Sequence, residues 1–254
     1  MHVAVVLRLG PDLTEELEIN ADGTDIDREW IGFKLNDLDD QALEEAVLLK
    51  EASGAKVTAL ALAGEGVERQ LQTAIARGAD DAVQVGHDLE NPGSRAAAHL
   101  LAPVIRDLGV DLVLTGVQTS EDVFGQLAPF LAGLLKWRVV NGVNGVRIAG
   151  EGLEATQEYS GGYAARFALP VPTVLGVQAA SQPPRYVSGS RLRQASAVPV
   201  RTLDAALPEG FAPPAVASLN LPERSNRAEM IEGDAAAVVA KLLQTLSERS
   251  VLGG

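Results

Sequence analysis

Residues 112–130 read LVLTGVQTSEDVFGQLAPF, in which a polar loop separates two apolar segments. The first segment predicts a buried strand that ends near Gly116, and the second predicts a helix over residues 123–135. Two explanations account for the polar residues between them. Ser120 or Asp122 can cap the helix. Alternatively, Gly116 lets the backbone approach a polar ligand such as a nucleotide, and the first amides of the helix hold its phosphate.

The residues before this stretch alternate short apolar runs with amphipathic segments. Such alternation is typical of a parallel sheet covered by helices on both faces, so we predict a Rossmann-like, doubly wound α/β fold with a mostly parallel sheet. Ligands of these folds bind beyond the carboxyl ends of the strands, and the loops that follow the strands are expected to line one crevice. Strands are predicted at 3–7, 56–62, 82–85 and 111–114, and helices at 37–54, 66–78 and 95–109.

Two regions interrupt this alternation. An excursion over residues 16–36 contains Asp22-Gly23, which predicts a turn between two extended pieces. After residue 137, glycines separate alternating segments and predict a C-terminal antiparallel hairpin region over 145–178. We therefore predict a nucleotide-binding α/β domain at 1–190 that includes the hairpins, and an extended C-terminal arm ending in a helix at 191–254.

The terminal helix is amphipathic. It either packs on its own domain or docks on a partner subunit, since helical spacing alone favours neither. Its apolar face consists of Ala236, Val239, Leu242, Leu243 and Leu246.

The composition excludes several classes of protein. A formal net charge of −13 disfavours a nucleic-acid partner, and the absence of cysteine excludes disulfides and thiolate sites. His2, His87 and His99 show no metal-ligand spacing. No apolar run reaches the roughly 18 residues of a membrane span, and no signal-peptide pattern opens the chain. We therefore expect a soluble, cytoplasmic protein.

No motif for catalysis is present. The chain contains neither a P-loop, nor the Gly-x-Gly-x-x-Gly of dinucleotide-binding folds, nor a Gly-x-Ser-x-Gly elbow. The acidic pairs Asp39-Asp40 and Glu44-Glu45 are interpreted as carboxylates at a helix start and on an exposed face. We predict no catalytic residues and no metal site, and a nucleotide pocket without a phosphate loop.

Several stretches, taken in order, resemble the β subunit of electron transfer flavoprotein. The resemblance covers nearly the whole chain and rests on the order and spacing of its motifs. The stretches are VLR at 6–8, NDLDDQALEEAVLLKE at 36–51, AIARGADDAVQV at 74–85, the loop at 116–126, QEYSGGYAARFALPVPTVL at 157–175, PPRY at 183–186 and ERSNRAEMIEGDAAAVVAKLL at 223–243.

The resemblance implies a heterodimer with an α subunit that carries FAD and on which the C-terminal arm and helix pack. This chain would hold an adenine nucleotide, AMP in most members, while the pair passes electrons from a dehydrogenase to an acceptor oxidoreductase. The implied cofactor-binding residues are Val5, Leu7, Arg8, Asn36, Asp37, Leu38, Asp39, Leu62, Gly116, Val117, Gln118, Thr119, Ser120, Glu121, Asp122, Val123, Phe124, Gly125, Gln126 and Leu127.

Two alternatives remain open at this point. An electron-bifurcating member would hold a second FAD in the same crevice, and Pro129 resembles a residue of such members. A nucleotide-binding regulatory module without redox function would share the α/β architecture. Such a module would need neither the hairpins nor the C-terminal arm.

The loops of this chain depart from the family pattern. Phe124 is bulky, and Glu121 would repel a phosphate unless it turned outward. The segment after PPRY lacks the leucine-proline pair of the family's partner-recognition loop, so we expect a dehydrogenase other than the usual acyl-CoA type. Its arginines can attract an acidic partner. The predicted docking residues are Arg185, Tyr186, Gly189, Arg191 and Arg193.

Overall fold

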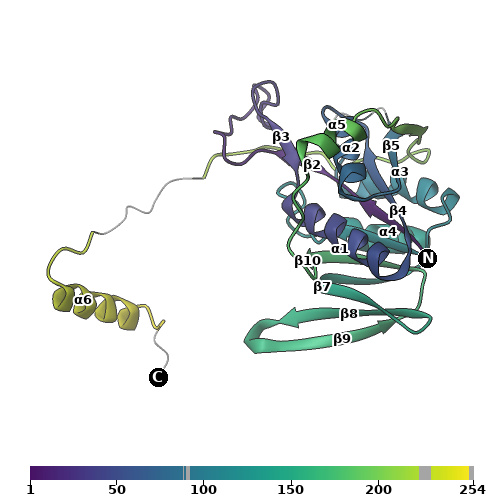
Figure 1. Ribbon diagram of the computed structural model, residues 1–254. Coiled ribbons are helices and arrows are strands. Elements are labelled where there is room, and N and C mark those ends of the chain that lie inside the picture. The colour runs from purple at the N-terminus through teal and green to yellow at the C-terminus, as the bar shows by residue number, and fades with distance from the viewer. Residues whose placement is uncertain (88, 90–91, 223–229, 252–254) are drawn as a thin grey trace. The chain divides into compact units, whose positions relative to one another are not determined.

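The computed structural model describes residues 1–87, 89, 92–222 and 230–251 (Figure 1). The chain divides into two compact units, residues 1–217 and 218–254, each of which is described by itself. Part of the last family-like stretch, residues 223–229, lies outside the described residues.

The first unit is built on one large sheet, which comprises nine strands in the described part of the chain. Seven neighbouring strands run parallel, and the last two continue the sheet antiparallel at one edge. The order is β11 (Arg201–Asp204), β5 (Asp81–Gly86), β4 (Lys56–Leu62), β1 (His2–Val6), β6 (Leu112–Gly116), β10 (Thr173–Ala179), β7 (Arg138–Ala149), β8 (Gly152–Tyr159) and β9 (Tyr163–Leu169).

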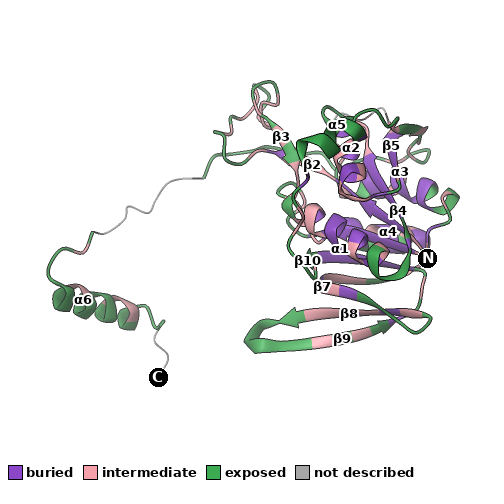
Figure 2. Ribbon diagram, viewed as in Figure 1, coloured by how far each residue is buried: buried purple, intermediate pink, exposed green. Residues whose placement is uncertain are grey.

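Helices cover both faces of the parallel strands because those strands are apolar on both sides. Along β1, Val3 and Val5 join one core with α1 (Asp37–Ser53) and α2 (Val67–Arg77). Ala4 and Val6 join a second core with α3 (Ser94–Asp107) and α4 (Leu127–Leu135). Each large aliphatic side chain buried in this way contributes about 1.5–3 kcal/mol. Figure 2 shows the buried residues gathered in the inner strands and the adjoining helices, which confirms the doubly wound fold.

The ends of α1 follow from its flanking residues. The helix begins after Asn36 with three aspartates in its first turn, where negative charge interacts favourably with the helix dipole. It ends at Gly54, whose φ of 71° is left-handed and whose N–H donates to the carbonyl of Lys50. A residue with a Cβ pays a steric cost in this conformation, and glycine does not.

The two extended pieces predicted within residues 16–36 meet at an antiparallel bridge, whereas a second pairing reaches back to residues 9–11, outside the predicted bounds. Strands β2 (Leu9–Pro11) and β3 (Phe33–Leu35) pair antiparallel, and Ile19 forms an antiparallel bridge with Ile26. The turn between the bridged residues contains Gly23 at a φ of 70°. The Asp22-Gly23 turn is confirmed.

The predicted hairpin region ended too late. Strands β7, β8 and β9 are antiparallel neighbours, with a short 3₁₀ turn (Ser160–Gly162) between β8 and β9. Strand β10, however, lies parallel between β6 and β7 and is buried along its first five residues. An unalternated apolar run such as TVLGV is typical of a central parallel strand, which explains why β10 leaves the hairpin pattern.

The predicted boundary at residue 190 was also too early. The helix α5 (Gly189–Ala195) packs on α2 through the buried Ala195, and β11 pairs with β5. The first unit therefore continues to residue 217. The sequence missed this because neither element is long or periodic enough to be distinguished from a Pro-rich connection.

The second unit contains α6 (Ala235–Glu248). Asp234 caps this helix, since its Oδ1 accepts from the N–H of Ala237 at 2.9 Å. The apolar face expected from the sequence is present, and none of the helix is buried (Figure 2). Val239 and Leu243, for example, are about half exposed, at 54% and 51%.

Candidate functional site

The carboxyl ends of β1 and β6 meet the start of α1 at a buried carboxylate. Asp39 is fully buried, and its side chain accepts hydrogen bonds from Arg8 Nε at 3.0 Å and Arg8 Nη2 at 2.9 Å. The backbone N–H groups of Arg8 and Gly116 donate to the same carboxylate at 3.1 and 2.6 Å. A buried charge is tolerated only with such partners, so Arg8 and Asp39 hold the ends of β1 and β6 and the start of α1 together.

Gly116 is needed for the approach of α1. A Cβ at this position would lie 2.6 Å from the backbone N of Asp39 and from the carbonyl carbon of Leu38. The space beside the glycine is therefore filled by the start of the helix. The sequence interpretation assigned that space to a ligand, and the structure corrects it.

The loop between β6 and α4 is bound to two residues of the excursion at 16–36. Asn36 Nδ2 donates to the carbonyl of Gln118 at 2.9 Å, and Arg28 Nη2 lies 2.5 Å from Glu121 Oε1. Within the loop, Thr119 and Asp122 exchange backbone hydrogen bonds. Glu121 thus points toward Arg28 on the protein surface, which is the outward orientation that its charge requires.

Asp122 caps α4 from this loop. Its Oδ2 accepts from the N–H groups of Gln126 at 2.9 Å and Leu127 at 3.3 Å, and Ser94 Oγ donates to it at 2.6 Å. Arg8 Nη1 lies 3.7 Å away, and the Asp122 side chain is 11% exposed. The N-cap residue is Gln126, and neither Ser120 nor Asp122 occupies that position as the sequence predicted; Asp122 instead accepts hydrogen bonds at the helix start from the preceding loop. The helix begins at Leu127 and not at residue 123, as the sequence predicted, because Asp122 to Gln126 form the capping turn.

A nucleotide phosphate at this helix start would need the same donors. The first amides of α4 are the groups that the sequence interpretation assigned to phosphate, and Asp122 already accepts hydrogen bonds from two of them. A second anion within about 4 Å of this carboxylate would be repelled, more strongly than in water because the position is shielded. The arrangement therefore does not fit a phosphate at the start of α4.

Five of the other predicted cofactor-binding residues fall into two groups. Val5 and Leu7 are buried in the core, and Leu62 is partly buried at the end of β4. Val123 and Phe124, in contrast, are exposed at 64% and 89% on the loop. The structure thus brings Arg8, Asn36, Asp39, Gly116, Gln118 and Asp122 together through direct contacts, with Asp37 exposed beside them.

Comparison with known proteins places this architecture in a family. A model described as the electron transfer flavoprotein domain matches residues 25–208. The chain is 30% identical to the electron transfer flavoprotein subunit beta of Bacillus subtilis (strain 168), over 99% of this chain and 100% of that one. The chain belongs to the electron transfer flavoprotein β-subunit family. The counterpart of Methylophilus methylotrophus is 29% identical over 98% of both chains.

A relative with a more specialised name is also similar. The acryloyl-CoA reductase electron transfer subunit gamma of Anaerotignum propionicum is 26% identical over 80% of this chain and 78% of its own length. Membership of the electron transfer flavoprotein β family implies an electron-transfer role and pairing with an α subunit.

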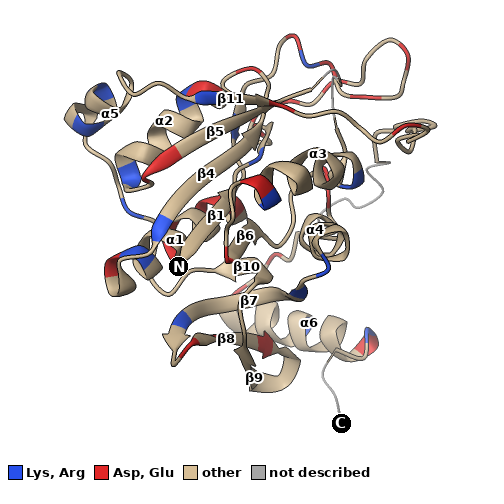
Figure 3. Ribbon diagram, turned by 90° about the vertical axis from the view of Figure 1, so that its right-hand side faces the viewer, with Lys and Arg blue, Asp and Glu red and all other residues tan. Residues whose placement is uncertain are grey.

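The structure divides the predicted docking residues. Arg185 is held by α1: its Nη2 lies 2.8 Å from Glu44 Oε1 and its Nη1 lies 2.5 Å from Glu51 Oε1. The hydrogen bonds that Arg185 donates to Glu51 and then to Glu44 raise the pKa of Arg185, and its hydrogen bond to Glu51 lowers the pKa of Glu51. Tyr186 is 93% exposed. Gly189, Arg191 and Arg193 are exposed on α5, where Figure 3 shows basic residues in blue.

Two buried glutamates were missed by the sequence interpretation. Glu44 and Glu45 were assigned to an exposed helix face, yet they are 2% and 0% exposed. Glu45 accepts from the N–H groups of Val146 at 2.5 Å and Ser181 at 2.6 Å, so it joins β7 to the segment after β10. The available signal was their position on α1 beside the apolar Ala42 and Ala46, which places Glu45 on the buried face.

The histidines serve as structural residues. His2 Nε2 lies 2.8 Å from Thr58 Oγ1, and burial, together with nearby Lys56, lowers the pKa of His2. His99 packs edge-to-face with Phe211 at 4.8 Å between ring centroids. Within the described residues, no group of three or more histidines and carboxylates is arranged to hold a metal ion. Nor is any described helix long and apolar enough to cross a bilayer.

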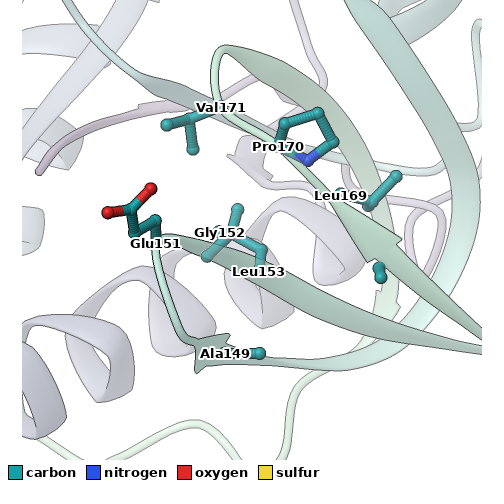
Figure 4. Close-up of a pocket in the computed structure, with 8 residues that line it drawn as sticks. Ala149, Glu151, Gly152, Leu153, Leu169, Pro170 and Val171 are labelled. Carbon is teal, nitrogen blue, oxygen red and sulfur yellow. The ribbon is translucent and has the colours of Figure 1, made fainter.

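A shallow pocket lies at the edge of the sheet opposite the carboxyl ends of β1 and β6. It has a volume of about 460 Å³ and is lined by the turn between β7 and β8 and by the residues after β9 (Figure 4). Its walls are mostly apolar, with Glu151 at the rim and Pro170 and Val171 across from it. This is the edge where the parallel strands start, whereas ligands of doubly wound folds bind where the strands end.

Proposed function

We propose that this chain is the β subunit of a cytoplasmic electron transfer flavoprotein heterodimer. Its α partner carries FAD, and the pair passes electrons from a dehydrogenase to an acceptor oxidoreductase. The observation that carries this proposal is the similarity to β subunits over 98–99% of the chain, which includes the arm and terminal helix. A match of this extent disfavours a free-standing regulatory module.

The contacts of the charged side chains near the ends of β1 and β6 are consistent with a subunit that presents surfaces to its partners. The charged side chains of the crevice are engaged with one another: Arg8 with Asp39, and Asp122 with Ser94 and the start of α4. We therefore propose that the chain has no catalytic residues and that the flavin of the partner supplies the redox chemistry.

The C-terminal unit supports pairing. Its helix α6 has exposed apolar residues, and apolar side chains on one face of an amphipathic helix mark an interaction site. We propose that α6 and its arm pack on the α subunit, and that Tyr186 and α5 contact the dehydrogenase. The basic side chains of α5 would favour an acidic surface on that partner.

The ligand of the crevice is a separate question. The family resemblance proposes AMP, and a second FAD if the protein bifurcates electrons. The loops that converge at the ends of β1 and β6 support a binding position of this kind, whereas the Asp122 cap weighs against a phosphate at α4.

The test is to co-express the chain with the product of the neighbouring gene and purify the complex. Nucleotides released on denaturation are then identified and counted by mass spectrometry. One flavin per heterodimer, reduced in one-electron steps and reoxidised by an acceptor, would support the proposal. Two flavins per heterodimer would support bifurcation, and a homodimer without flavin would exclude both.

A further inference from the structure

The donors around Asp122 form an anion site that the chain fills with its own carboxylate. Two backbone amides, a hydroxyl and a guanidinium converge on the position of Oδ2: Gln126 and Leu127 by their N–H groups, Ser94 by Oγ, and Arg8 by Nη1. Amides at a helix start combined with an arginine are the donors that bind phosphate in proteins. Here every one of them faces Asp122.

Arg8 is oriented for this role by its other contacts. Its Nε and Nη2 are committed to Asp39, which leaves Nη1 directed toward Asp122. Nη1 is buried and has no hydrogen-bond partner among the described residues, and Asp122 Oδ2 lies 3.7 Å from it. Without Asp122, the Nη1 N–H of Arg8 would be available to an anion that entered the site, while Arg8 would stay paired with Asp39.

The loop that carries Asp122 is held on both sides. Asn36 binds the carbonyl of Gln118, and Arg28 binds Glu121. Asn141 Nδ2 donates to the carbonyl of Gly125 at 3.2 Å, and a Cβ on Gly125 would lie 2.3 Å from the carbonyl oxygen of Val117. To move Asp122 out of the site, this loop would have to break several contacts together.

We infer that Asp122 takes the place of a nucleotide phosphate at the first turn of α4, so that this subunit folds and pairs with its partner without an adenine nucleotide in the crevice. The pairing part of the inference rests on the proposed function. The filled anion site does not, since it follows from the contacts of this chain alone.

The test compares Asp122→Ala with Glu209→Gln, which removes one negative charge at an exposed residue outside the anion site. Purified heterodimers are denatured, and FAD and AMP are counted separately. A missing heterodimer or missing FAD would refute the proposed function, whereas a full complement of AMP with normal FAD would refute only this inference. We expect the wild-type heterodimer to retain FAD. We expect it to release less than about a tenth of an equivalent of AMP or other adenine mononucleotide per heterodimer.

The second readout is the shift in melting temperature on addition of AMP or sodium phosphate. Wild type and Glu209→Gln are expected to shift alike and little. Asp122→Ala is expected to melt lower without ligand and to recover with either anion, with an apparent Kd about ten-fold lower than wild type. If Asp122→Ala does not fold, Asp122→Asn, which keeps the shape and removes the charge, replaces it. A variant that gains no anion-dependent stabilisation, or a wild type that binds AMP more tightly than the variant, would overturn the inference.

Discussion

At the scale of single residues, the region at the ends of β1 and β6 is organised by carboxylates that bind other parts of the same chain. Asp39 satisfies its charge with Arg8 and the N–H of Gly116, and removing one partner of such a buried pair costs about 3–5 kcal/mol. Asp122, on the loop after β6, likewise accepts hydrogen bonds from Ser94 and from the N–H groups at the start of α4. Side chains that the family resemblance assigned to a nucleotide therefore stabilise the meeting point of β1, β6 and α1.

Gly116→Ala tests the close approach of α1 to β6. The new Cβ would lie 2.6 Å from backbone atoms of α1, which cannot yield without moving the helix. We expect the free energy of unfolding, measured with urea, to fall by about 1–3 kcal/mol or more. Gly133→Ala is the control, because Gly133 is in α4 with nothing within 4 Å of its Cβ position. That variant should be unchanged or more stable by up to about 1 kcal/mol, and equal destabilisation of both variants would contradict the steric argument.

His2 makes stability depend on pH. Burial lowers the pKa of His2 below its unfolded value of about 6.5, so its contribution is complete above that pH and is lost as the pH falls through the folded pKa. We expect the free energy of unfolding to decline from pH 7.5 toward pH 5.5, with at most about 1.4 kcal/mol per pH unit from this one group. The decline should be shallower in His2→Gln. Parallel pH profiles for the two proteins would show that His2 does not contribute.

At the scale of elements, α1 binds segments that are distant from it in sequence. Glu44 holds Arg185, and Glu45 holds Ser181 and the N–H of Val146. One turn of helix thereby fixes the end of β10, the start of α5 and the middle of β7. Polar residues on a buried helix face are costly unless satisfied, and here the backbone of these segments satisfies them.

Arg185→Ala is expected to release the segment that leads into α5. The change leaves the Glu44 carboxylate buried without its cation, at a cost of about 3–5 kcal/mol. Hydrogen exchange should become faster in residues 181–195 and remain unchanged in β1 and β4. Arg191→Ala is the matched control, since Arg191 is exposed on α5. Unchanged exchange in the Arg185 variant would show that other contacts hold the segment.

At the scale of the whole molecule, the two units differ in what they bury. The first unit encloses two cores on either side of its sheet, whereas α6 buries no residue. Apolar side chains left exposed along one helix face are stabilised when a partner covers them. The C-terminal unit is therefore the part of the chain whose stability we expect to depend most on the α subunit.

Leu243→Glu and Gln244→Glu test this expectation with the same added charge on adjacent residues. Leu243 belongs to the apolar face of α6, while Gln244 contacts Glu248 at the polar side. We expect Leu243→Glu to weaken pairing with the α subunit at least about ten-fold, because a charge would be buried in the interface, with the melting temperature of the isolated chain unchanged. Gln244→Glu should pair like wild type. Equal affinities in a titration by analytical ultracentrifugation would place α6 outside the interface.

The sequence alone determined the fold class and the family. Buried strands without alternation, separated by amphipathic helices, predict a doubly wound sheet from local pattern, and this was confirmed. Local signals also located the turn at Gly23 and the end of α1 at Gly54, because a positive φ favours glycine. The same signals predicted the position of the crevice residues on the loops that follow β1 and β6.

Only the tertiary structure decided the partners of the charged groups. Asp39, Glu44 and Asp122 have the same chemistry whether they bind a ligand, face water or bind a distant part of the chain. Their partners Gly116, Arg185 and Ser94 lie 77, 141 and 28 residues away in sequence, and no local pattern encodes such pairings. The placement of β10 and β11 was decided in the same way, because hydrogen bonding between parallel strands depends on which strand edge remains unpaired once the rest of the sheet has formed.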